Sequence, residues 1–354
     1  MTETRVAGFA DSAFLLRCVS NEALHLIVMP TEACNFRCVY CYEDFRYKQM
    51  EPWVVRGIKT LLGRRAPGLR ELSISWFGGE PLLASNVIEE VMTHVQGLAG
   101  AHPALRVSSD ATTNAYLLTP VLANRLLDRG VSRYQISFDG PREWHDRKRV
   151  LAGGKGTFDR IWGNLIALRG LARKFTITIR VHVDRNNVEA MREFIDGCGD
   201  AFAADPRFEL FVRGLSRLGG ANDAELAVFA PGEGEAVFQE LRSYARSRGL
   251  RTMQFSQSDS VCYAARGNSY VVRANGRLNK CTIALEHPNN QVGHIREDGT
   301  VDVDSQKMAG WMRGVWSGDP AALKCPMKGH ADPERRRPEG AIPLIMVPPS
   351  PVVN

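Results

Sequence analysis

The sequence CNFRCVYC, residues 34–41, places Cys34, Cys38 and Cys41 within eight residues at the spacing C-x3-C-x2-C. It follows an apolar run at 24–29. Three thiolates this close can converge on one inorganic centre, but they cannot all pair as disulfides. Zinc sites normally close with four protein ligands, and no fourth cysteine or histidine lies nearby. Because [4Fe–4S] clusters usually take four cysteine thiolates, a cluster here would leave one iron without a protein ligand.

Composition limits the class of protein. The chain has 354 residues, of which 44% are hydrophobic, enough for one large core and a smaller appended domain. No apolar run approaches the ~20 residues of a membrane helix, and residues 1–10 lack the order of a secretory signal. Eight cysteines fit metal ligation in a reducing cytosol, so we expect a cytoplasmic protein. The net charge of +6 is scattered without an aromatic-interleaved basic stripe, which argues against nucleic-acid binding.

Strand-like apolar segments alternate with amphipathic helical segments along the chain. Strands are predicted at 24–29, 71–76, 105–111, 133–138, 175–183 and 207–213. Helices are predicted at 51–64, 86–98, 119–129, 157–172, 187–202 and 233–248. Six strand–helix units in a row predict an α/β fold with a parallel sheet and outer helices, and periodicity leaves open whether the sheet closes. Residues 1–23 are expected to form a short lead-in strand or arm.

A second motif, Gly78-Gly79-Glu80-Pro81, follows the strand at 71–76. Two glycines let the backbone approach a ligand without an intervening Cβ. Glu80 offers a charged acceptor, and Pro81 stiffens the exit from the turn. Taken alone, the four residues are also compatible with an ordinary strand-to-helix turn.

The two motifs together resemble the radical S-adenosylmethionine (radical SAM) superfamily, and the chain is similar to its SPASM/Twitch-type peptide maturases over roughly residues 22–330. The resemblance implies a [4Fe–4S] cluster on Cys34, Cys38 and Cys41. Its unligated iron would chelate the methionine moiety of S-adenosylmethionine, and reductive cleavage would release a 5'-deoxyadenosyl radical. The resemblance also implies a partial (β/α)6 TIM-like barrel whose chemistry lies on loops at the C-terminal ends of the strands.

The same resemblance implies a set of cofactor contacts. In the family, the Gly-Gly-Glu-Pro segment holds the aminoacyl end of S-adenosylmethionine, and small polar groups at later strand ends contact the cofactor. The implied cofactor-binding residues are Tyr40, Gly78, Gly79, Glu80, Pro81, Asn114, Ser137 and Arg180.

Three of these contacts come from the ends or faces of later strands. Asn114 ends Thr112-Thr113-Asn114, where Ala115 replaces the family's usual glycine, and Ser137 precedes Asp139 by two residues. Asp139 capping the following turn stays open as an alternative role. Arg180 is a candidate partner for the methionine carboxylate because its planar fork suits bidentate binding, and a surface-facing arginine is the alternative.

A second cysteine set lies near the C-terminus. Cys262 and Cys281 fit C-x13-G-x4-C, with a strand at 269–274 and a hairpin signal at Asn275-Gly276 that folds the chain back. The pattern resembles the first half of the SPASM/Twitch domain, and only Cys325 remains of its later cysteines. One auxiliary [4Fe–4S] cluster on Cys262, Cys281 and Cys325 is implied, its fourth position open or taken by His330 or Cys198. Three unmetallated structural cysteines are the alternative.

The chain is expected to divide into four segments. They are an N-terminal arm at 1–22, the radical SAM partial barrel at 23–230, a Twitch/SPASM-like auxiliary-cluster domain at 231–330 and a Pro-rich tail at 331–354.

The resemblance implies a radical SAM enzyme that abstracts a hydrogen from a ribosomally made precursor peptide and forms an intrapeptide crosslink. Expected partners are that peptide, with or without a separate recognition protein, and an electron donor such as flavodoxin or ferredoxin. A radical SAM epimerase or dehydrogenase acting on a small molecule such as an aminoglycoside is the alternative. A non-catalytic zinc scaffold would leave the Gly-Gly-Glu-Pro motif without a purpose. The sequence identifies neither the substrate nor the bond that changes.

Overall fold

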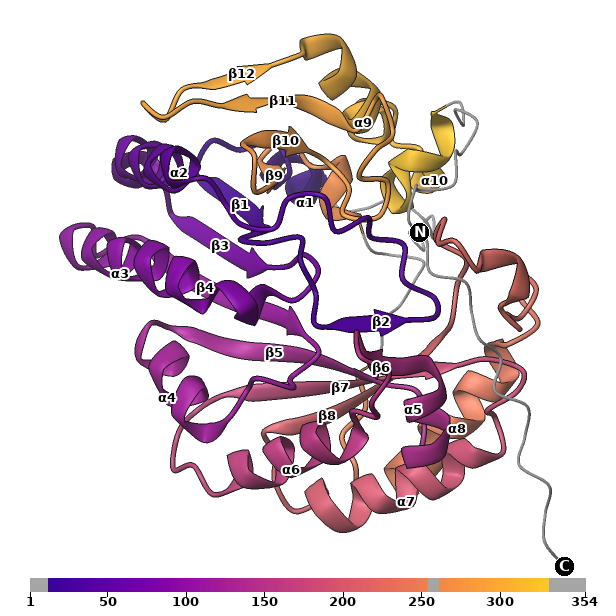
Figure 1. The fold of residues 1–354 in the computed structure, drawn as a ribbon. Coiled ribbons are helices and arrows are strands. Elements are labelled where there is room, and N and C mark those ends of the chain that lie inside the picture. The colour runs from indigo at the N-terminus through magenta and orange to yellow at the C-terminus, as the bar shows by residue number, and fades with distance from the viewer. Residues whose placement is uncertain (1–11, 254–260, 331–354) are drawn as a thin grey trace, which may run out of the picture.

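The computed structural model describes residues 12–253 and 261–330. The Pro-rich tail at 331–354 and the first eleven residues of the expected arm lie outside the described residues. In the described chain, one ten-stranded sheet runs in the order β12-β11-β10-β9-β1-β3-β4-β5-β7-β8 (Figure 1). No helix of the described chain has the length and hydrophobicity needed to cross a bilayer.

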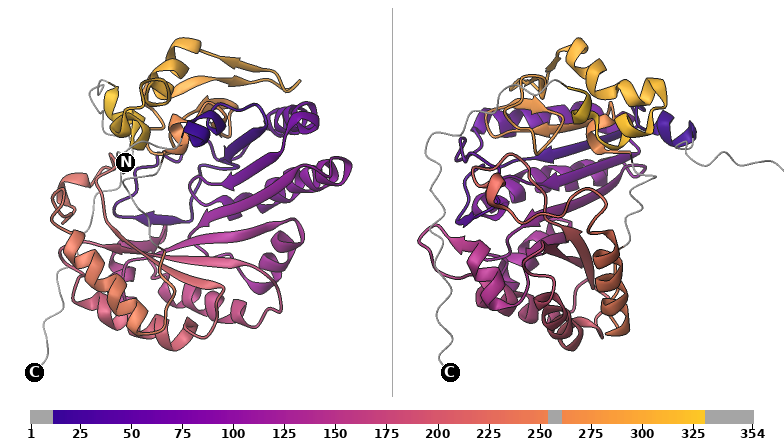
Figure 2. Two further views of the ribbon diagram at one scale, coloured as in Figure 1. Left: turned by 180° about the vertical axis from the view of Figure 1, so that it is seen from behind. Right: turned by 90° about the vertical axis from the view of Figure 1, so that its right-hand side faces the viewer.

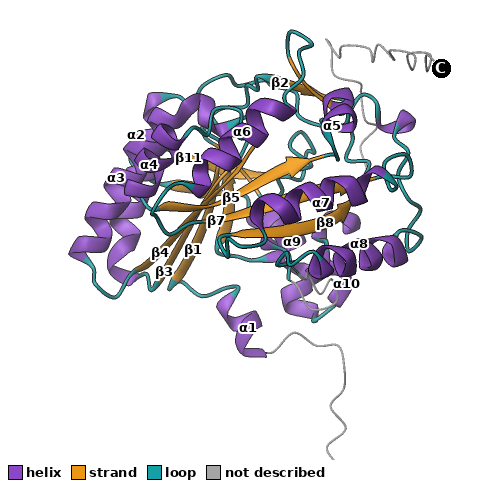
Figure 3. Cartoon of the chain, turned by 90° about the horizontal axis from the view of Figure 1, so that it is seen from below, coloured by secondary structure: helices purple, strands orange, loops and turns teal. Residues whose placement is uncertain are grey.

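Six strands of this sheet alternate with helices and pair in parallel with their neighbours. The strands are β1 (Ala23–Val28), β3 (Glu71–Trp76), β4 (Arg106–Thr113), β5 (Val131–Phe138), β7 (Thr176–Val183) and β8 (Phe208–Gly214). The helices are α2 (Pro52–Arg65), α3 (Ser85–Ala101), α4 (Pro120–Asp128), α6 (Phe158–Arg169), α7 (Ala190–Phe202) and α8 (Glu235–Ser247). Figures 1 and 3 show these helices around the outside of the strands. The predicted α/β fold with a large parallel sheet is confirmed, and it is consistent with a partial barrel.

The two faces of the sheet differ in chemistry. Along β3 burial alternates, and Leu72, Ile74 and Trp76 are buried in the core beneath the helices. The opposite face carries polar groups: His25 Nε2 lies 3.0 Å from Ser75 Oγ. Ser75 Oγ in turn donates to Asp110 Oδ2 at 2.9 Å. The sequence thus builds an apolar outer layer and a polar inner face that suits a polar ligand.

Three short elements were not predicted. Strand β2 (Phe36–Cys38) pairs antiparallel with β6 (Arg149–Leu151), and α5 (Arg142–Lys148) precedes β6. Figure 1 shows β2 and β6 beside the carboxyl ends of β5 and β7. The expected lead-in strand is wrong where it is described, because α1 (Ser12–Arg17) is helical. Its sequence, SAFLLR, contains good helix formers and no period-two alternation.

The C-terminal segment continues the same sheet. Strand β9 (Ser269–Val272) pairs parallel with β1, and β10 (Arg277–Asn279), β11 (Gln291–Ile295) and β12 (Val301–Val303) follow in antiparallel order. Helices α9 (Ser305–Ser317) and α10 (Pro320–Lys324) come next, and the two views of Figure 2 show them at the end of the molecule formed by these strands. The predicted hairpin turn is confirmed, since Gly276 has φ of +80° between β9 and β10. The domain boundaries stay a prediction.

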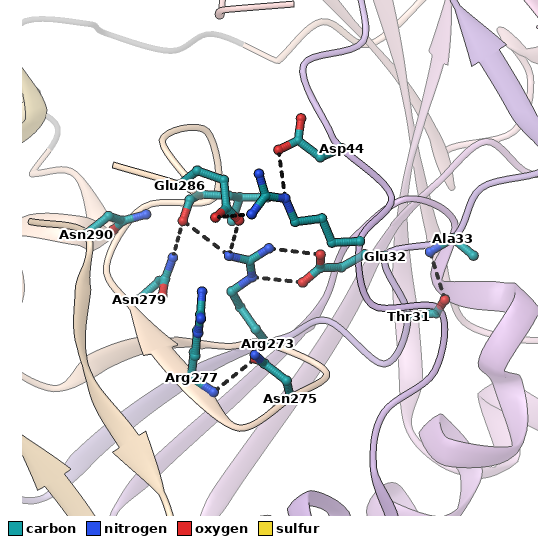
Figure 4. A network of polar contacts seen from close by, with 12 residues as sticks. Thr31, Glu32, Ala33, Asp44, Arg273, Asn275, Arg277, Asn279, Glu286 and Asn290 are labelled. Atoms are coloured by element: carbon teal, nitrogen blue, oxygen red, sulfur yellow. Dashed lines mark hydrogen bonds and ion pairs between the residues drawn. The ribbon is translucent and has the colours of Figure 1, made fainter. Parts of the chain in front are cut away.

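A buried ionic network joins this C-terminal segment to the loop after β1 (Figure 4). Arg273 Nε and Nη2 donate to the two carboxylate oxygens of Glu32 at 2.8 and 2.9 Å. Both side chains are at most 2% exposed. Arg273 Nη1 also donates to Glu286 at 2.5 Å, and Glu286 accepts from Arg46 at 3.0 Å. Because Glu32 lies two residues before Cys34, the network fixes the start of the cysteine loop against β9 and β10.

Replacing Arg273 with methionine should destabilise the protein by about 3–5 kcal/mol, because Glu32 would remain buried without a counter-ion. Urea unfolding measures the change. The double variant Arg273→Met/Glu32→Leu should recover part of the loss, since no unpaired charge remains. Arg296→Met removes the exposed pair with Asp302 and should cost less than about 1 kcal/mol. Equal effects of Arg273→Met and Arg296→Met would contradict the assigned role of the network.

Candidate functional site

The three clustered cysteines lie on the loop between β1 and α2, at the carboxyl ends of the parallel strands. Short strand β2 contains Cys38 and is held by its pairing with β6. The Val39 amide donates to the Lys148 carbonyl at 2.9 Å, and the Asn222 side chain donates to the Val39 carbonyl at 2.9 Å. The loop is therefore held by hydrogen bonds to two segments, the β5–α6 connection and the segment after β8.

The two glycines of the second motif allow a close backbone contact with the cysteine loop. A Cβ on Gly79 would lie 2.5 Å from the carbonyl oxygens of both Glu32 and Ala33. Gly78 has φ of +114°, and a Cβ there would overlap the Thr31 carbonyl oxygen. The Glu80 amide donates to the Ala33 carbonyl at 2.9 Å. The motif thus packs directly against the residues that lead into Cys34.

Glu80 is fully buried and bound on both oxygens. Its Oε1 accepts from the Leu82 amide at 2.9 Å and from Thr113 Oγ1 at 2.7 Å, and Oε2 accepts from the Asn114 amide at 2.7 Å. Burial raises the pKa of Glu80, while these donors and the charge of Arg149 lower it. Glu80 therefore connects the turn after β3 to the turn after β4. These hydrogen bonds fix the position of its carboxylate.

Asn114 links that frame to the cysteines. Its Nδ2 donates to Asn35 Oδ1 at 2.8 Å and lies 3.9 Å from Cys34 Sγ. Cys34 Sγ also accepts from the Phe36 amide at 3.3 Å. Asn114 thus lies beside the first cysteine, as expected of a contact at the cofactor site.

A second anchor is Tyr40, inside the cysteine motif. Its hydroxyl donates to Asp139 Oδ2 at 2.7 Å and accepts from Arg149 Nη1 at 2.7 Å. His182 Nδ1 lies 3.2 Å from the same hydroxyl and 3.6 Å from Asp139 Oδ1. Burial opposes ionisation of Asp139, but the contact with His182 and the charges of Arg149 and Lys148 lower its pKa well below the usual range. Asp139 is therefore an anion at neutral pH, and its carboxylate orients Tyr40.

The three thiols near Tyr40 lie close enough to affect one another's ionisation. Burial, together with the charge of Cys38, raises the pKa of Cys34 to about 12, and burial likewise raises the pKa of Cys38 and Cys41. Within residues 12–253 and 261–330, no three His, Cys, Asp or Glu side chains are grouped to hold a single metal ion.

The remaining predicted contacts lie on the inner face of the sheet. Ser137 on β5 and Arg180 on β7 are aligned across the two strands, so they share a face. Arg180 is therefore directed into the barrel and is not the surface-facing alternative. Its electrostatic neighbours include Tyr40 and Tyr42, which places it towards the cysteine loop.

The C-terminal cysteines also lie near one another. Burial raises the pKa of Cys262, and the charges of Cys281 and Cys325 raise it further. None of the eight cysteines forms a disulfide. Burial raises the pKa of half-buried Tyr42, and the charges of Cys41 and Cys281 contribute, so Tyr42 lies near a cysteine of each set. Sequence reasoning missed Tyr42 as a bridge between the two sets, although it stands directly after Cys41.

Of the two residues suggested as a fourth auxiliary ligand, only Cys198 lies far from the C-terminal cysteines. It is buried on α7, which Figure 1 shows at the opposite end of the sheet from β9. His330 Nδ1 lies 3.4 Å from Asn289 Nδ2, and the next residue, Asn290, accepts a hydrogen bond from the Cys281 amide at 2.8 Å. His330 Nε2 is buried without a hydrogen-bond partner among the described residues, so His330 stays a prediction for the fourth position.

A cavity of about 370 Å³ lies at the other end of the barrel strands. Its lining includes Cys18, His25, Asp110, Arg133 and Arg266. The cavity is separated from the cysteine loop by the length of the strands, so we do not assign the chemistry to it.

Residues 28–196 match the family model described as the radical SAM superfamily. With the geometry above, this match identifies residues 28–196 as a radical SAM domain.

Curated relatives include a nucleotide-modifying enzyme. The GTP 3',8-cyclase of Pelotomaculum thermopropionicum is 28% identical over 284 residues, which cover 73% of this chain and 81% of the cyclase. Several other curated relatives are matched over only 28–57% of their own length, so the chain spans less than two thirds of those proteins.

Two solved structures share the fold. The protein anSMEcpe with bound AdoMet has a TM-score of 0.63 and 18% identity, over 81% of this chain and 80% of that one. Streptococcus suis SuiB bound to precursor peptide SuiA has a TM-score of 0.61 and 15% identity, over 85% of this chain and 69% of SuiB. At these identities the likeness establishes the fold alone.

Replacing Gly79 with alanine should displace the cysteine loop, because the added Cβ meets two carbonyl oxygens. Iron bound per chain after anaerobic reconstitution should fall by up to about four atoms, the content of one four-iron cluster, since all three thiolates of that cluster must be held together. Gly153→Ala is the matched control, because a Cβ there meets open space. Iron content unchanged in Gly79→Ala would contradict the assigned packing role.

Stability should depend on two buried histidines. Burial, reinforced by nearby arginine charge, lowers the pKa of His145 to about 3 and that of His182 to about 4. Unfolded histidine titrates near ~6.5, so between that pH and about 4 the unfolded chain binds more protons and stability falls as pH falls. The slope should approach ~1.4 kcal/mol per pH unit for each histidine.

Denaturant unfolding at pH 7.5, 6.0 and 5.0 measures this dependence. In the variant His145→Gln, the fall of the unfolding free energy with pH should be smaller by the contribution of one histidine, whatever the stability of the variant at pH 7.5. The same pH dependence in the wild type and in His145→Gln would show that His145 is protonated as readily in the folded protein as in the unfolded chain.

Proposed function

We propose that the chain is a radical SAM peptide maturase that forms an intrapeptide crosslink in a ribosomally made precursor peptide. The observation that carries the proposal is the arrangement of a second cysteine set across Tyr42 from the first, on a radical SAM fold. The fold shared with SuiB, whose structure holds a precursor peptide, supports a peptide substrate.

Cys34, Cys38 and Cys41 would hold the [4Fe–4S] cluster that binds S-adenosylmethionine. When bound, cluster and cofactor supply a 5'-deoxyadenosyl radical that abstracts one hydrogen atom from the substrate. Tyr40 and the frame around Glu80 hold the cysteine loop in place before the cofactor binds. We assign Gly78, Gly79, Glu80, Pro81, Asn114 and Ser137 to the cofactor side of the site.

Cys262, Cys281 and Cys325 would hold one auxiliary [4Fe–4S] cluster in a Twitch/SPASM-like domain. This cluster would accept the electron that crosslinking leaves after one hydrogen atom is abstracted and a second hydrogen departs as a proton. An external donor such as flavodoxin or ferredoxin would supply the electron for cofactor cleavage in the cytoplasm. Recognition of the peptide takes place on this chain or through a separate recognition protein.

A small-molecule substrate is the second candidate. The alignment with GTP 3',8-cyclase, which covers 73% of this chain, favours this class over an aminoglycoside. Under this candidate the same radical would act on a purine nucleotide.

Anaerobic reconstitution should give about eight irons per chain for two four-iron clusters and about four for one. Replacing Cys38 with alanine should abolish 5'-deoxyadenosine formation, because one iron of the cluster would lose its ligand. Cys198→Ala, a buried cysteine on α7, should leave this activity intact. Zinc in place of iron, or 5'-deoxyadenosine formed by Cys38→Ala, would refute radical SAM chemistry at this site.

A short open reading frame beside the gene would supply a peptide for the second test. Incubation of the loaded enzyme with that peptide should remove two hydrogen atoms from it, detected as a mass loss, and tandem mass spectrometry should locate the new bond. Turnover of GTP without any change in the peptide would favour the nucleotide candidate.

A further inference from the structure

Two arginines lie side by side on the inner face of the sheet. The register of β7 and β8 aligns Arg180 with Phe211 and His182 with Arg213, so both arginines share the face of His182. His182 contacts the Tyr40 hydroxyl at 3.2 Å. The pair therefore stands beside the cysteine loop at the barrel mouth. Only Arg180 was a candidate from the sequence, and Arg213 was missed.

Neither arginine forms a salt bridge with a described residue, and Arg180 Nε is buried without a hydrogen-bond partner there. Burial and the charge of Arg213 lower the pKa of Arg180 to about 10, and partial burial lowers that of Arg213. Arg180 is half-buried and Arg213 is exposed, so the cost of lacking a counter-ion falls mainly on Arg180, whose Nε is buried. Two like charges left together at a site mouth indicate that an anion completes the arrangement.

The neighbouring cations are already compensated. Lys148 Nζ donates to Asp184 at 2.5 Å, and Arg149 is bound by Tyr40 next to Asp139. The uncompensated charge on this part of the inner face thus comes from two guanidinium groups. Their planar forks match the two oxygens of a single carboxylate, whereas a triphosphate would bring several negative charges.

We propose that Arg180 and Arg213 form an anion subsite that binds a carboxylate of the substrate peptide close to the reacting residue. The inference rests on the proposed peptide substrate and specifies it as a peptide with an Asp or Glu side chain or a C-terminal carboxylate at this position. It also assigns Arg180 to the substrate, in place of the methionine carboxylate.

Fluorescence anisotropy with a fluorescein-labelled hexaglutamate peptide tests the subsite without requiring cluster or turnover. Hexaglutamate should bind the purified chain, and hexaglutamine should not. Arg180→Gln and Arg213→Gln should each weaken binding about tenfold or more, because a charge-assisted hydrogen bond is lost. Arg213→Lys, which keeps the charge without the fork, should lose less. Arg192 is an exposed arginine on α7, away from the proposed subsite. Arg192→Gln removes one positive charge there and should leave binding unchanged.

Three results would overturn the inference. The first is hexaglutamate binding that is equal in Arg213→Gln and Arg192→Gln. The second is binding of GTP, weakened by both arginine variants, without binding of hexaglutamate. The third is a loss of S-adenosylmethionine binding in Arg180→Gln, measured by equilibrium dialysis, with peptide binding retained. Because the peptide assay does not depend on the cluster, a failure of radical chemistry would leave its outcome readable on its own.

Discussion

The buried ion pair between Glu32 and Arg273 is the constraint on which the position of the two cysteine sets depends. It joins the residues just before Cys34 to the turn between β9 and β10. Since β9 also pairs with β1, the C-terminal segment is an extension of the barrel sheet. Two unrelated stretches of sequence are therefore held in one rigid frame, with Tyr42 between their thiols. A buried pair of this kind contributes specificity of arrangement more than net stability.

The polar contacts within the barrel complete that frame. Glu80 and Tyr40 each use buried hydrogen bonds to fix a different part of the cysteine loop. Fully satisfied buried networks rigidify a site, because breaking any one bond leaves a desolvated polar group. Buried atoms without a hydrogen-bond partner among the described residues include Asp139 Oδ1 and Arg149 Nε in the Tyr40 network, and Arg180 Nε on the same face. Fixed anchors around the thiols and an open cation beside them separate the holding of a cofactor from the recognition of a substrate.

Hydrophobic periodicity predicted the six parallel strands and their helices to within a few residues, because an apolar outer layer imposes a repeating pattern. The short β2–β6 pair left no such pattern, since three residues cannot show a period. Pairing of β9 with β1 is non-local and invisible to spacing. The cysteine and Gly-Gly-Glu-Pro motifs located the site, but the partners Glu32, Arg273 and Arg213 are isolated charged residues in the sequence. Only the fold brings them together.

The central claim is that the chain itself holds the cysteine loop in place before any cofactor binds. Amide hydrogen exchange at residues 31–44 of the iron-free protein tests this claim directly. In this segment the Glu32 amide donates to the Tyr47 carbonyl and the Val39 amide donates to the Lys148 carbonyl. The account predicts that these amides exchange nearly as slowly as those of β1 and β3. Exchange as fast as that of the exposed residues Gly153 and Lys155, becoming slow only after cluster assembly, would contradict it.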